Sequence, residues 1–207
     1  MNTEYRCYIP KLGDYELFRN TIIATKPEGL EKERGFLQGF IDTPINTDPV
    51  LVKARVQWLS AYYSTRISKK GIDSEQDKIV KIITMPGFDA KLDQKSHRLV
   101  DELVYDMEKS GTKRHFSFAS KYCHHCRPNI YPIYDRLNMC VMNIFCGYKF
   151  DSKDYEGFVK CYKMFYNEFI EGYCQKNELD AYEGLYIDKY IQAIGSDSES
   201  ELRKLLP

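Results

Sequence analysis

The chain has 207 residues, of which 43% are hydrophobic and 29% charged, and its 30 basic residues balance 30 acidic ones. These values are typical of a soluble globular protein that is long enough to bury a core. No run of about 18 apolar residues occurs, which excludes a predicted membrane span. The aromatic content of 14% is high, and such rings either pack in helical cores or stack on bases.

Hydrophobic periodicity predicts helices along almost the whole chain. In chain order we expect them over residues 14–25, 28–42, 48–67, 75–84, around 100–107, and over 116–126, 137–145, 153–175 and 179–194. No stretch alternates at period two, so we expect an all-α fold. We expect a single domain over 1–207, in which the helices of 1–50 and 150–207 pack beside a central lobe of 50–150.

Local signals support several helix boundaries. Ser74-Glu75-Gln76-Asp77 has the pattern of a capping box, and Ser96 is the expected N-cap of the helix around 100–107. Pro86-Gly87 should break the chain after the helix at 75–84, and Gly147 should end the helix at 137–145.

The charge is unevenly distributed although the net charge is zero. Residues 109–136 contain six basic residues and one acid, a local charge of +5, which leaves −5 for the rest of the chain. The seven cysteines are an odd number in a chain that needs no disulfides for stability, so we expect reduced thiols. The start of the chain lacks the apolar segment of a secretory signal, so we expect a cytoplasmic protein.

The most informative segment is 116–135, FSFASKYCHHCRPNIYPIYD, which places Lys121 among aromatic residues. An ordinary helical lysine is solvated. Here Phe116, Phe118 and Tyr122 could exclude water, which penalises the charged ammonium and favours a nucleophilic amine. Lys121 is therefore a candidate catalytic residue.

Asp135 is the second candidate catalytic residue. It precedes the helix expected over 137–145, where aspartate is a preferred N-cap, and the pattern alone gives a cap and a catalytic carboxylate equal weight. A helix N-terminus favours an ionised carboxylate, which could stabilise an oxocarbenium ion or relay a proton to the lysine. Fourteen residues separate Lys121 from Asp135, enough for two helical turns and a returning loop, so both side chains could line one cleft.

This segment resembles the helix–loop–helix region of the helix-hairpin-helix DNA glycosylases, closest to their 8-oxoguanine glycosylase-like bacterial branch. In that superfamily a hairpin leads into the helix with the nucleophilic lysine, and a Pro-containing turn places an aspartate at the next helix. Lys121 and Asp135 occupy those positions. Weaker similarity at 58–67 and 187–191 extends the resemblance over about 50–193. The hairpin differs, because 117–120 read SFAS where the family usually has glycines, and the loop to the aspartate is shorter.

The resemblance implies a two-lobed helical fold with the active-site cleft between the lobes. It implies a DNA glycosylase and AP lyase that flips a damaged or modified base from double-stranded DNA, in repair or in antiphage defence. Lys121 would attack C1′ and form a Schiff base that permits β-elimination, with assistance from Asp135. We expect a monomer that uses no cofactor and no metal and does not bind membranes.

Further residues are expected to contact the DNA substrate. We expect contacts with phosphates from helix N-terminal amides and from Lys113, Arg114, His115, Ser117, Ser120 and Arg136. Three tyrosines are candidate walls of the base pocket, with core packing as the alternative for each: Tyr63, Tyr131 and Tyr134.

The Cys123-His124-His125-Cys126 cluster has residue types that bind metals. On a helix, however, the two cysteines share one face while the histidines point elsewhere, so four ligands cannot converge locally. We therefore interpret the cluster as packing.

Two other functions remain open. A non-catalytic nucleic-acid- or nucleotide-binding helical module would bind with steep salt dependence and release no base. A protein–protein adaptor, in which Asp135 is only a cap, would have no affinity for DNA.

Overall fold

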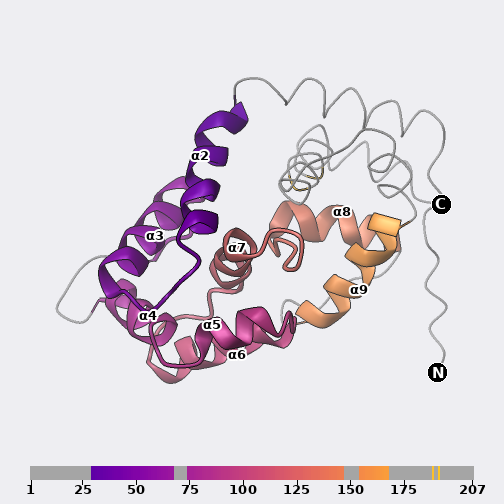
Figure 1. Cartoon of the computed structure of the whole chain (residues 1–207). Coiled ribbons are helices and arrows are strands. Elements are labelled where there is room, and N and C mark those ends of the chain that lie inside the picture. Colours follow the sequence, from indigo (N-terminus) through magenta and orange to yellow (C-terminus); the bar gives the residue numbers. More distant parts are fainter. Residues whose placement is uncertain (1–28, 68–73, 147–153, 168–187, 189–190, 192–207) are drawn as a thin grey trace. The chain divides into compact units, whose positions relative to one another are not determined.

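The computed structural model of the chain describes residues 29–67, 74–146, 154–167, 188 and 191, whose course is shown in Figure 1. Every regular element within these residues is a helix, and they contain no strand. The expected all-α fold class is therefore confirmed. In the same part of the chain, no helix combines the length and the apolar composition that a membrane crossing requires.

The chain divides into two compact units. Unit 2 is the continuous segment Leu37–Tyr131, whereas unit 1 combines Met1–Phe36 with Pro132–Pro207. Helix α2, Gly29–Asp42, crosses the boundary between them. The central segment suggested by the sequence, 50–150, shares most of its length with unit 2 but continues into unit 1.

Five further helices build unit 2: α3 (Pro49–Tyr62), α4 (Glu75–Ile83), α5 (Phe88–Asp93), α6 (Arg98–Lys109) and α7 (Phe116–Cys126). The sequence predicted all of them except α5, whose six residues are too few to show a helical hydrophobic period. Helices α3 and α6 each pack against both α4 and α7 (Figure 1), so these four helices enclose one core.

Helix α3 is bounded by local backbone features. Asp48 caps its first turn by accepting two backbone amide hydrogens. The helix ends at Tyr62 rather than at residue 67 as predicted, because Ser64 and Arg66 adopt left-handed φ angles of 50° and 59°.

The start of helix α4 has the predicted capping box. The Ser74 hydroxyl accepts the Asp77 amide at 3.3 Å, and the Asp77 carboxylate accepts the Ser74 amide at 3.2 Å. Two backbone donors that no helical carbonyl can reach are therefore satisfied.

Two predictions concern the connection from α4 through α5 to α6, and one of them is confirmed. Pro86-Gly87 separates α4 from α5 as predicted, and Gly87 has a φ of 94° that favours glycine. The prediction that Ser96 is the N-cap of α6 is wrong. His97 directly precedes the helix, and its carbonyl accepts the Val100 amide at 3.2 Å.

A buried polar network centred on Asn46 joins distant segments of unit 2. The Asn46 side-chain amide donates to Asp89 Oδ1 at 2.6 Å, and its backbone amide donates to Asp89 Oδ2 at 2.9 Å. The Asn46 Oδ1 atom accepts the Tyr122 hydroxyl at 2.6 Å and Arg55 Nη1 at 3.1 Å. Burial raises the pKa of Tyr122 well above its usual range, so this hydroxyl remains a donor.

Arg55 extends the network to the chain between α2 and α3. Its side chain is only 3% exposed, and the guanidinium lies 4.4 Å from the centroid of the Phe40 ring. It donates to three backbone carbonyls, those of Gly39, Thr43 and Ile45. A buried arginine thus satisfies one carbonyl in the last turn of α2 and two in the segment between α2 and α3, which has no regular structure of its own.

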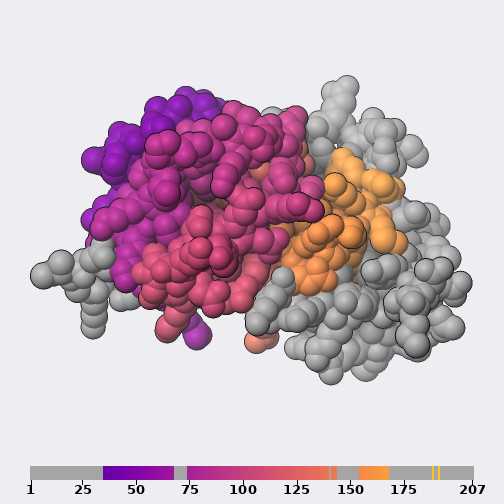
Figure 2. Space-filling view, turned by 90° about the horizontal axis from the view of Figure 1, so that it is seen from below, coloured from indigo at the N-terminus to yellow at the C-terminus, as the bar shows by residue number. Residues whose placement is uncertain are grey.

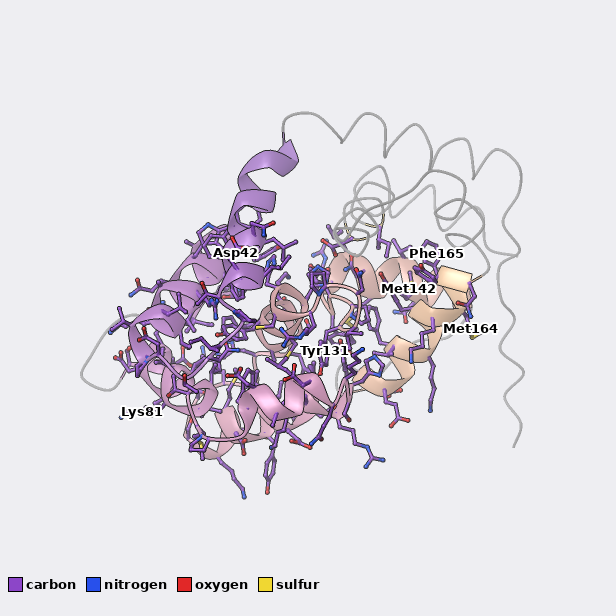
Figure 3. All side chains as sticks on the ribbon, viewed as in Figure 1. Asp42, Lys81, Tyr131, Met142, Met164 and Phe165 are labelled. Atoms are coloured by element: carbon purple, nitrogen blue, oxygen red, sulfur yellow. The ribbon has the colours of Figure 1, made fainter. Side chains whose placement is uncertain are left out.

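Unit 1 contributes α8 (Arg136–Cys146) and α9 (Tyr155–Phe165), which pack against each other. Met142 of α8 and Phe165 of α9, both labelled in Figure 3, are buried. Of the helix predicted over 153–175, the structure describes 154–167. The predicted helix at 14–25 lies outside the described residues, as does that at 179–194 except for residues 188 and 191.

Two polar side chains, Tyr155 and Asn138, order the turn that precedes α8. The Tyr155 hydroxyl donates to the Pro132 carbonyl at 2.8 Å. The Asn138 side-chain amide donates to the Ile133 carbonyl at 2.8 Å and to Asp188 Oδ1 at 2.7 Å. Asn138 thereby ties the turn to a residue 50 positions later in the chain.

The cysteines are in more than one state. Cys123 and Cys126 are free and buried, as predicted. Cys161 is disulfide-bonded, so the expectation of reduced thiols throughout is wrong at this position.

Candidate functional site

Lys121 lies near the middle of α7, a helix that is buried on all sides. Every residue from Phe118 to Cys126 is buried, which is the pattern of a helix inside a core rather than on a surface. Lys121 itself is 3% exposed, and its Nζ atom donates to the Ser117 hydroxyl at 2.8 Å. Ser117 stands one helical turn earlier on the same face.

Tyr63 supplies the second contact of this amine. Lys121 Nζ lies 4.8 Å from the centroid of the Tyr63 ring, within the range of a cation–π interaction. Tyr63 is the C-cap residue of α3, and α3 packs against α7. The structure therefore brings together two residues that the sequence assigned to the site, Lys121 and Tyr63.

His125 completes this group. Its Nε2 atom lies 3.2 Å from the Tyr63 hydroxyl, and the residue is fully buried. The aromatic rings of Phe40 and Trp58 have centroids 5.5 and 5.7 Å from the imidazole. Lys121, Tyr63 and His125, which we call the lysine cluster, all belong to unit 2.

For His125, the sequence suggests only metal binding or packing. Its contact with Tyr63 was missed because the two residues are 62 positions apart. One signal was available: Lys121 and His125 are four residues apart and so share a face of the helix.

Asp135 lies in unit 1 and caps α8. Its Oδ1 atom accepts the backbone amides of Leu137 and Asn138, each at 3.1 Å. The carboxylate is half-buried. Its predicted role as a cap is confirmed, while its role in catalysis stays a prediction. Lys121 belongs to unit 2, whereas Asp135 belongs to unit 1.

The predicted DNA-contacting residues before α7 are accompanied by acids. Lys113 and Arg114 are exposed. Arg114 lies 3.7 Å from Glu108, and His115 lies 3.6 Å from Glu75. The basic charge counted along the sequence is therefore partly offset in space by carboxylates from α4 and α6.

The other predicted contacts differ in exposure. Ser117 is half-buried and bonded to Lys121, whereas Ser120 is fully buried and donates to the Ser117 carbonyl at 3.2 Å. Arg136 is exposed at the first position of α8. Of these three side chains, Arg136 is the one placed as a contact with phosphate requires.

The two remaining candidate pocket tyrosines are packed in cores. Tyr131, labelled in Figure 3, is fully buried, and its carbonyl lies 2.9 Å from His124 Nδ1. Tyr134 is 3% exposed and meets the Phe158 ring edge-on at 5.0 Å between centroids. These placements agree with the core packing that the sequence also allowed.

The cysteines of α7 are buried thiols that are unsuited to act as nucleophiles. Burial raises the pKa of Cys123 well above its usual range and that of Cys126 to about 12, so both remain thiols. The described part of the chain contains no group of three or more residues positioned to hold a metal ion.

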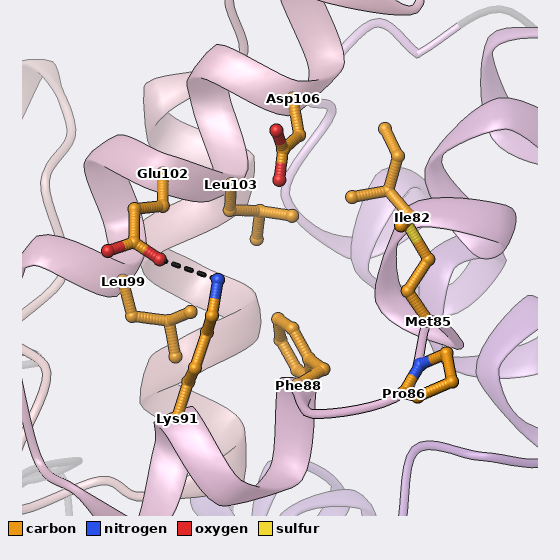
Figure 4. A pocket seen from close by; sticks show the side chains of 9 residues that line it. All are labelled: Ile82, Met85, Pro86, Phe88, Lys91, Leu99, Glu102, Leu103 and Asp106. Carbon is orange, nitrogen blue, oxygen red and sulfur yellow. Dashed lines mark hydrogen bonds and ion pairs between the residues drawn. The ribbon is translucent and has the colours of Figure 1, made fainter.

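A pocket of about 80 Å³ opens elsewhere on unit 2, between the end of α4, helix α5 and helix α6 (Figure 4). These helices contribute the magenta part of the surface in Figure 2. Apolar side chains form much of the lining, and Lys91 donates to Glu102 at 2.8 Å, which raises the pKa of the lysine. The lysine cluster contributes no residue to this lining, so the candidate site and the pocket are distinct.

A comparison with family models places the chain among known sequences. The model described as HI_0787_N, N-terminal domain, matches residues 25–130, just over half of the chain. The match contains the lysine cluster and ends next to the last residue of unit 2, Tyr131, before Asp135. Searches of curated proteins and of solved structures found no match. The chain belongs to the HI_0787_N family, whose N-terminal domain corresponds closely to unit 2.

Proposed function

We propose that the chain is a DNA glycosylase with associated AP lyase activity, related to the helix-hairpin-helix glycosylases. The observation that carries the proposal is the setting of Lys121, which is 3% exposed and contacts the Ser117 hydroxyl and the Tyr63 ring. Lysines that serve only solubility keep the ammonium group in water. An amine withdrawn from water and held by neighbouring side chains has the fixed position that a nucleophile needs.

The proposed reaction begins when the deprotonated Lys121 amine attacks C1′ of a flipped nucleotide. The bond between C1′ and the base breaks, and the base leaves with the electron pair and takes up a proton. The sugar ring then opens to give a Schiff base between Nζ and C1′. Loss of a proton from C2′ expels the 3′ phosphate by β-elimination, and hydrolysis releases the lysine.

Asp135 would stabilise the positive charge that develops at C1′ and would accept protons from the amine. Its two bonds with amides of α8 give the carboxylate a fixed orientation. We also propose that the chain has the two-lobed arrangement of those enzymes. The protein would act as a monomer on double-stranded DNA in the cytoplasm, and Lys113, Arg114 and Arg136 would contact the phosphates.

The lyase half can be tested without knowing the target base. A duplex with an abasic site presents the C1′ aldehyde directly, and borohydride should trap it covalently on the native protein. Lys121→Gln should form no adduct, whereas Lys163→Gln, at an exposed position of α9, should form as much as the native protein. No adduct with the native protein, together with tight DNA binding, would refute the lyase activity.

The glycosylase half requires a panel of modified duplexes and phage DNA, assayed for released base. Asp135→Asn separates the two roles of this residue, since asparagine caps helices as well as aspartate does but lacks the charge. We expect base release to fall strongly while the unfolding midpoint stays unchanged. Equal rates for Asp135→Asn and the native protein would leave Asp135 a cap only.

A non-catalytic nucleic-acid-binding module is the second candidate, favoured by the exposed Lys113 and Arg114 side chains beside the start of α7. It predicts binding that weakens steeply with salt, no base release, and only a modest effect of Lys121→Gln. An absence of DNA affinity even at low salt would instead favour the protein–protein adaptor.

A further inference from the structure

One tyrosine ring connects two positions of α7. The Tyr63 ring lies 4.8 Å from Lys121 Nζ, and its hydroxyl lies 3.2 Å from His125 Nε2. Lys121 and His125 are four residues apart, so both face the same side of the helix. The ring thus spans one helical turn of α7, with Lys121 Nζ near its centroid and the imidazole at its hydroxyl.

The anchor of this arrangement is His125. The residue is 0% exposed, and three aromatic rings, those of Phe40, Trp58 and Tyr63, lie with centroids 5.5, 5.7 and 5.7 Å from the imidazole. Close packing of this kind fixes the position of the imidazole.

Tyr63 itself lies at the end of a helix. It is the C-cap residue of α3, and the chain after it turns through left-handed residues at Ser64 and Arg66. The Tyr63 amide donates to the Leu59 carbonyl at 3.0 Å and the helix ends here, so the orientation of the ring depends on its side-chain contacts. The bond with His125 ties the end of this ring to the helix that bears Lys121.

We infer that His125 is a positioning residue for the Lys121 amine and acts through the hydroxyl of Tyr63. The inference rests on the proposed function for the role of Lys121 as nucleophile, but the positioning itself is a property of the protein without DNA. If the bond between His125 and Tyr63 is lost, the ring can turn away and the amine loses one of its contacts. Misplacement of a reacting group by about 1 Å can reduce a rate by about 100-fold.

The kinetic test measures the rate of borohydride trapping on an abasic duplex. We expect Tyr63→Phe, which keeps the ring and removes the hydroxyl, and His125→Phe each to slow trapping by roughly 10- to 100-fold. The double variant should be no slower than the slower single variant, because both changes remove the same bond. Tyr62→Phe removes the hydroxyl of the neighbouring tyrosine and should leave the rate unchanged.

A conservative variant distinguishes positioning from general support of the fold. The side-chain amide of glutamine in His125→Gln can bond to the Tyr63 hydroxyl, so this variant should recover most of the lost rate. If His125→Gln is as slow as His125→Phe, the inference is overturned. It is overturned equally if the effects of Tyr63→Phe and His125→Phe multiply in the double variant.

A spectroscopic test needs no DNA and separates this inference from the proposed function. With lysine labelled with ¹³C at Cε, the Lys121 signal, assigned with Lys121→Arg, should be shifted upfield by the ring current of Tyr63. We expect the shift to be lost in His125→Phe and kept in His125→Gln. A native shift without any trapping would refute the lyase activity alone, whereas an unchanged shift in a folded His125→Phe or Tyr63→Phe would refute the positioning role.

Discussion

Removal of the Asn46 side chain should strongly destabilise unit 2. Asn46→Ala removes the side-chain hydrogen bonds with Asp89, Tyr122 and Arg55, and a weaker contact with Cys126 Sγ at 4.0 Å. In this variant Arg55 still donates to backbone carbonyls, and half-buried Asp89 still accepts the backbone amide of residue 46. Each of these two side chains therefore loses only part of its hydrogen bonding. The Tyr122 hydroxyl is fully buried and loses its acceptor, which alone costs about 1–3 kcal/mol. Together the losses should lower the free energy of unfolding by about 3–4 kcal/mol.

Urea denaturation followed by tryptophan fluorescence measures this effect, because the single tryptophan, Trp58, lies in unit 2. The expected loss corresponds to a midpoint lower by roughly 2 M urea. Gln57→Ala removes an exposed amide from α3 and should change the free energy by less than about 0.5 kcal/mol. Tyr122→Phe leaves Arg55 bonded to Asn46 and should cost about 1 kcal/mol. An Asn46→Ala loss no larger than that of Tyr122→Phe would refute the reasoning.

Three further predictions concern a helix cap, a carboxylate and the buried thiols. Ser74→Ala removes the acceptor of the Asp77 amide and should lower the free energy of unfolding by about 1 kcal/mol in the same urea assay. The Asp77 pKa is lowered from 3.8 to about 2, chiefly by the hydrogen bond from Lys53, so its contribution to stability is present above pH 3.8 and is lost as the pH falls toward 2. Between about pH 5 and pH 2 at low salt, the free energy of unfolding should therefore fall less in Asp77→Asn than in the native protein. An equal fall in both proteins would contradict this role of Asp77. Burial raises the pKa of Cys123, and it raises that of Cys126 to about 12. Both thiols should therefore resist iodoacetamide at about pH 8 in the folded protein and react with it in urea. Peptide mass spectrometry measures the labelling of each cysteine. Labelling of either thiol without urea would show that α7 is accessible.

Features that depend on neighbours in the chain were predictable. The helical periods, the capping box at Ser74 and the break at Pro86-Gly87 are set by contacts within a few residues. The structure confirms the cap, the break and the helices predicted within the described residues. Helix α5 was missed because it is shorter than two turns, and the early end of α3 was missed because left-handed φ angles at non-glycine residues leave no mark in the sequence.

Features that depend on distant contacts were not predictable. Arg55 stands on α3 next to Val56, and an arginine in a helix is usually solvated, yet its carbonyl partners in the preceding segment bury it. The carboxylates beside Arg114 and His115 come from other helices, so a count of charge along the chain could not include them.

The candidate site shows the same division. Aromatic neighbours of Lys121 in its own helix suggested a lysine withdrawn from water, and its side chain is 3% exposed. The contact between His125 and Tyr63 depends on how α3 and α7 pack, which the sequence does not state. Asp135 could be assigned as a cap, whereas its chemistry depends on a substrate.

The order of the two units along the chain has a consequence for biosynthesis. Unit 2 is one uninterrupted segment, and unit 1 is divided into a part before it and a part after it. During translation, all of Leu37–Tyr131 is made before any residue of the second part of unit 1. Because domains fold as units while the chain emerges, the nascent protein can complete the packing around Lys121 first, and unit 1 must then form from two pieces with a folded insert between them.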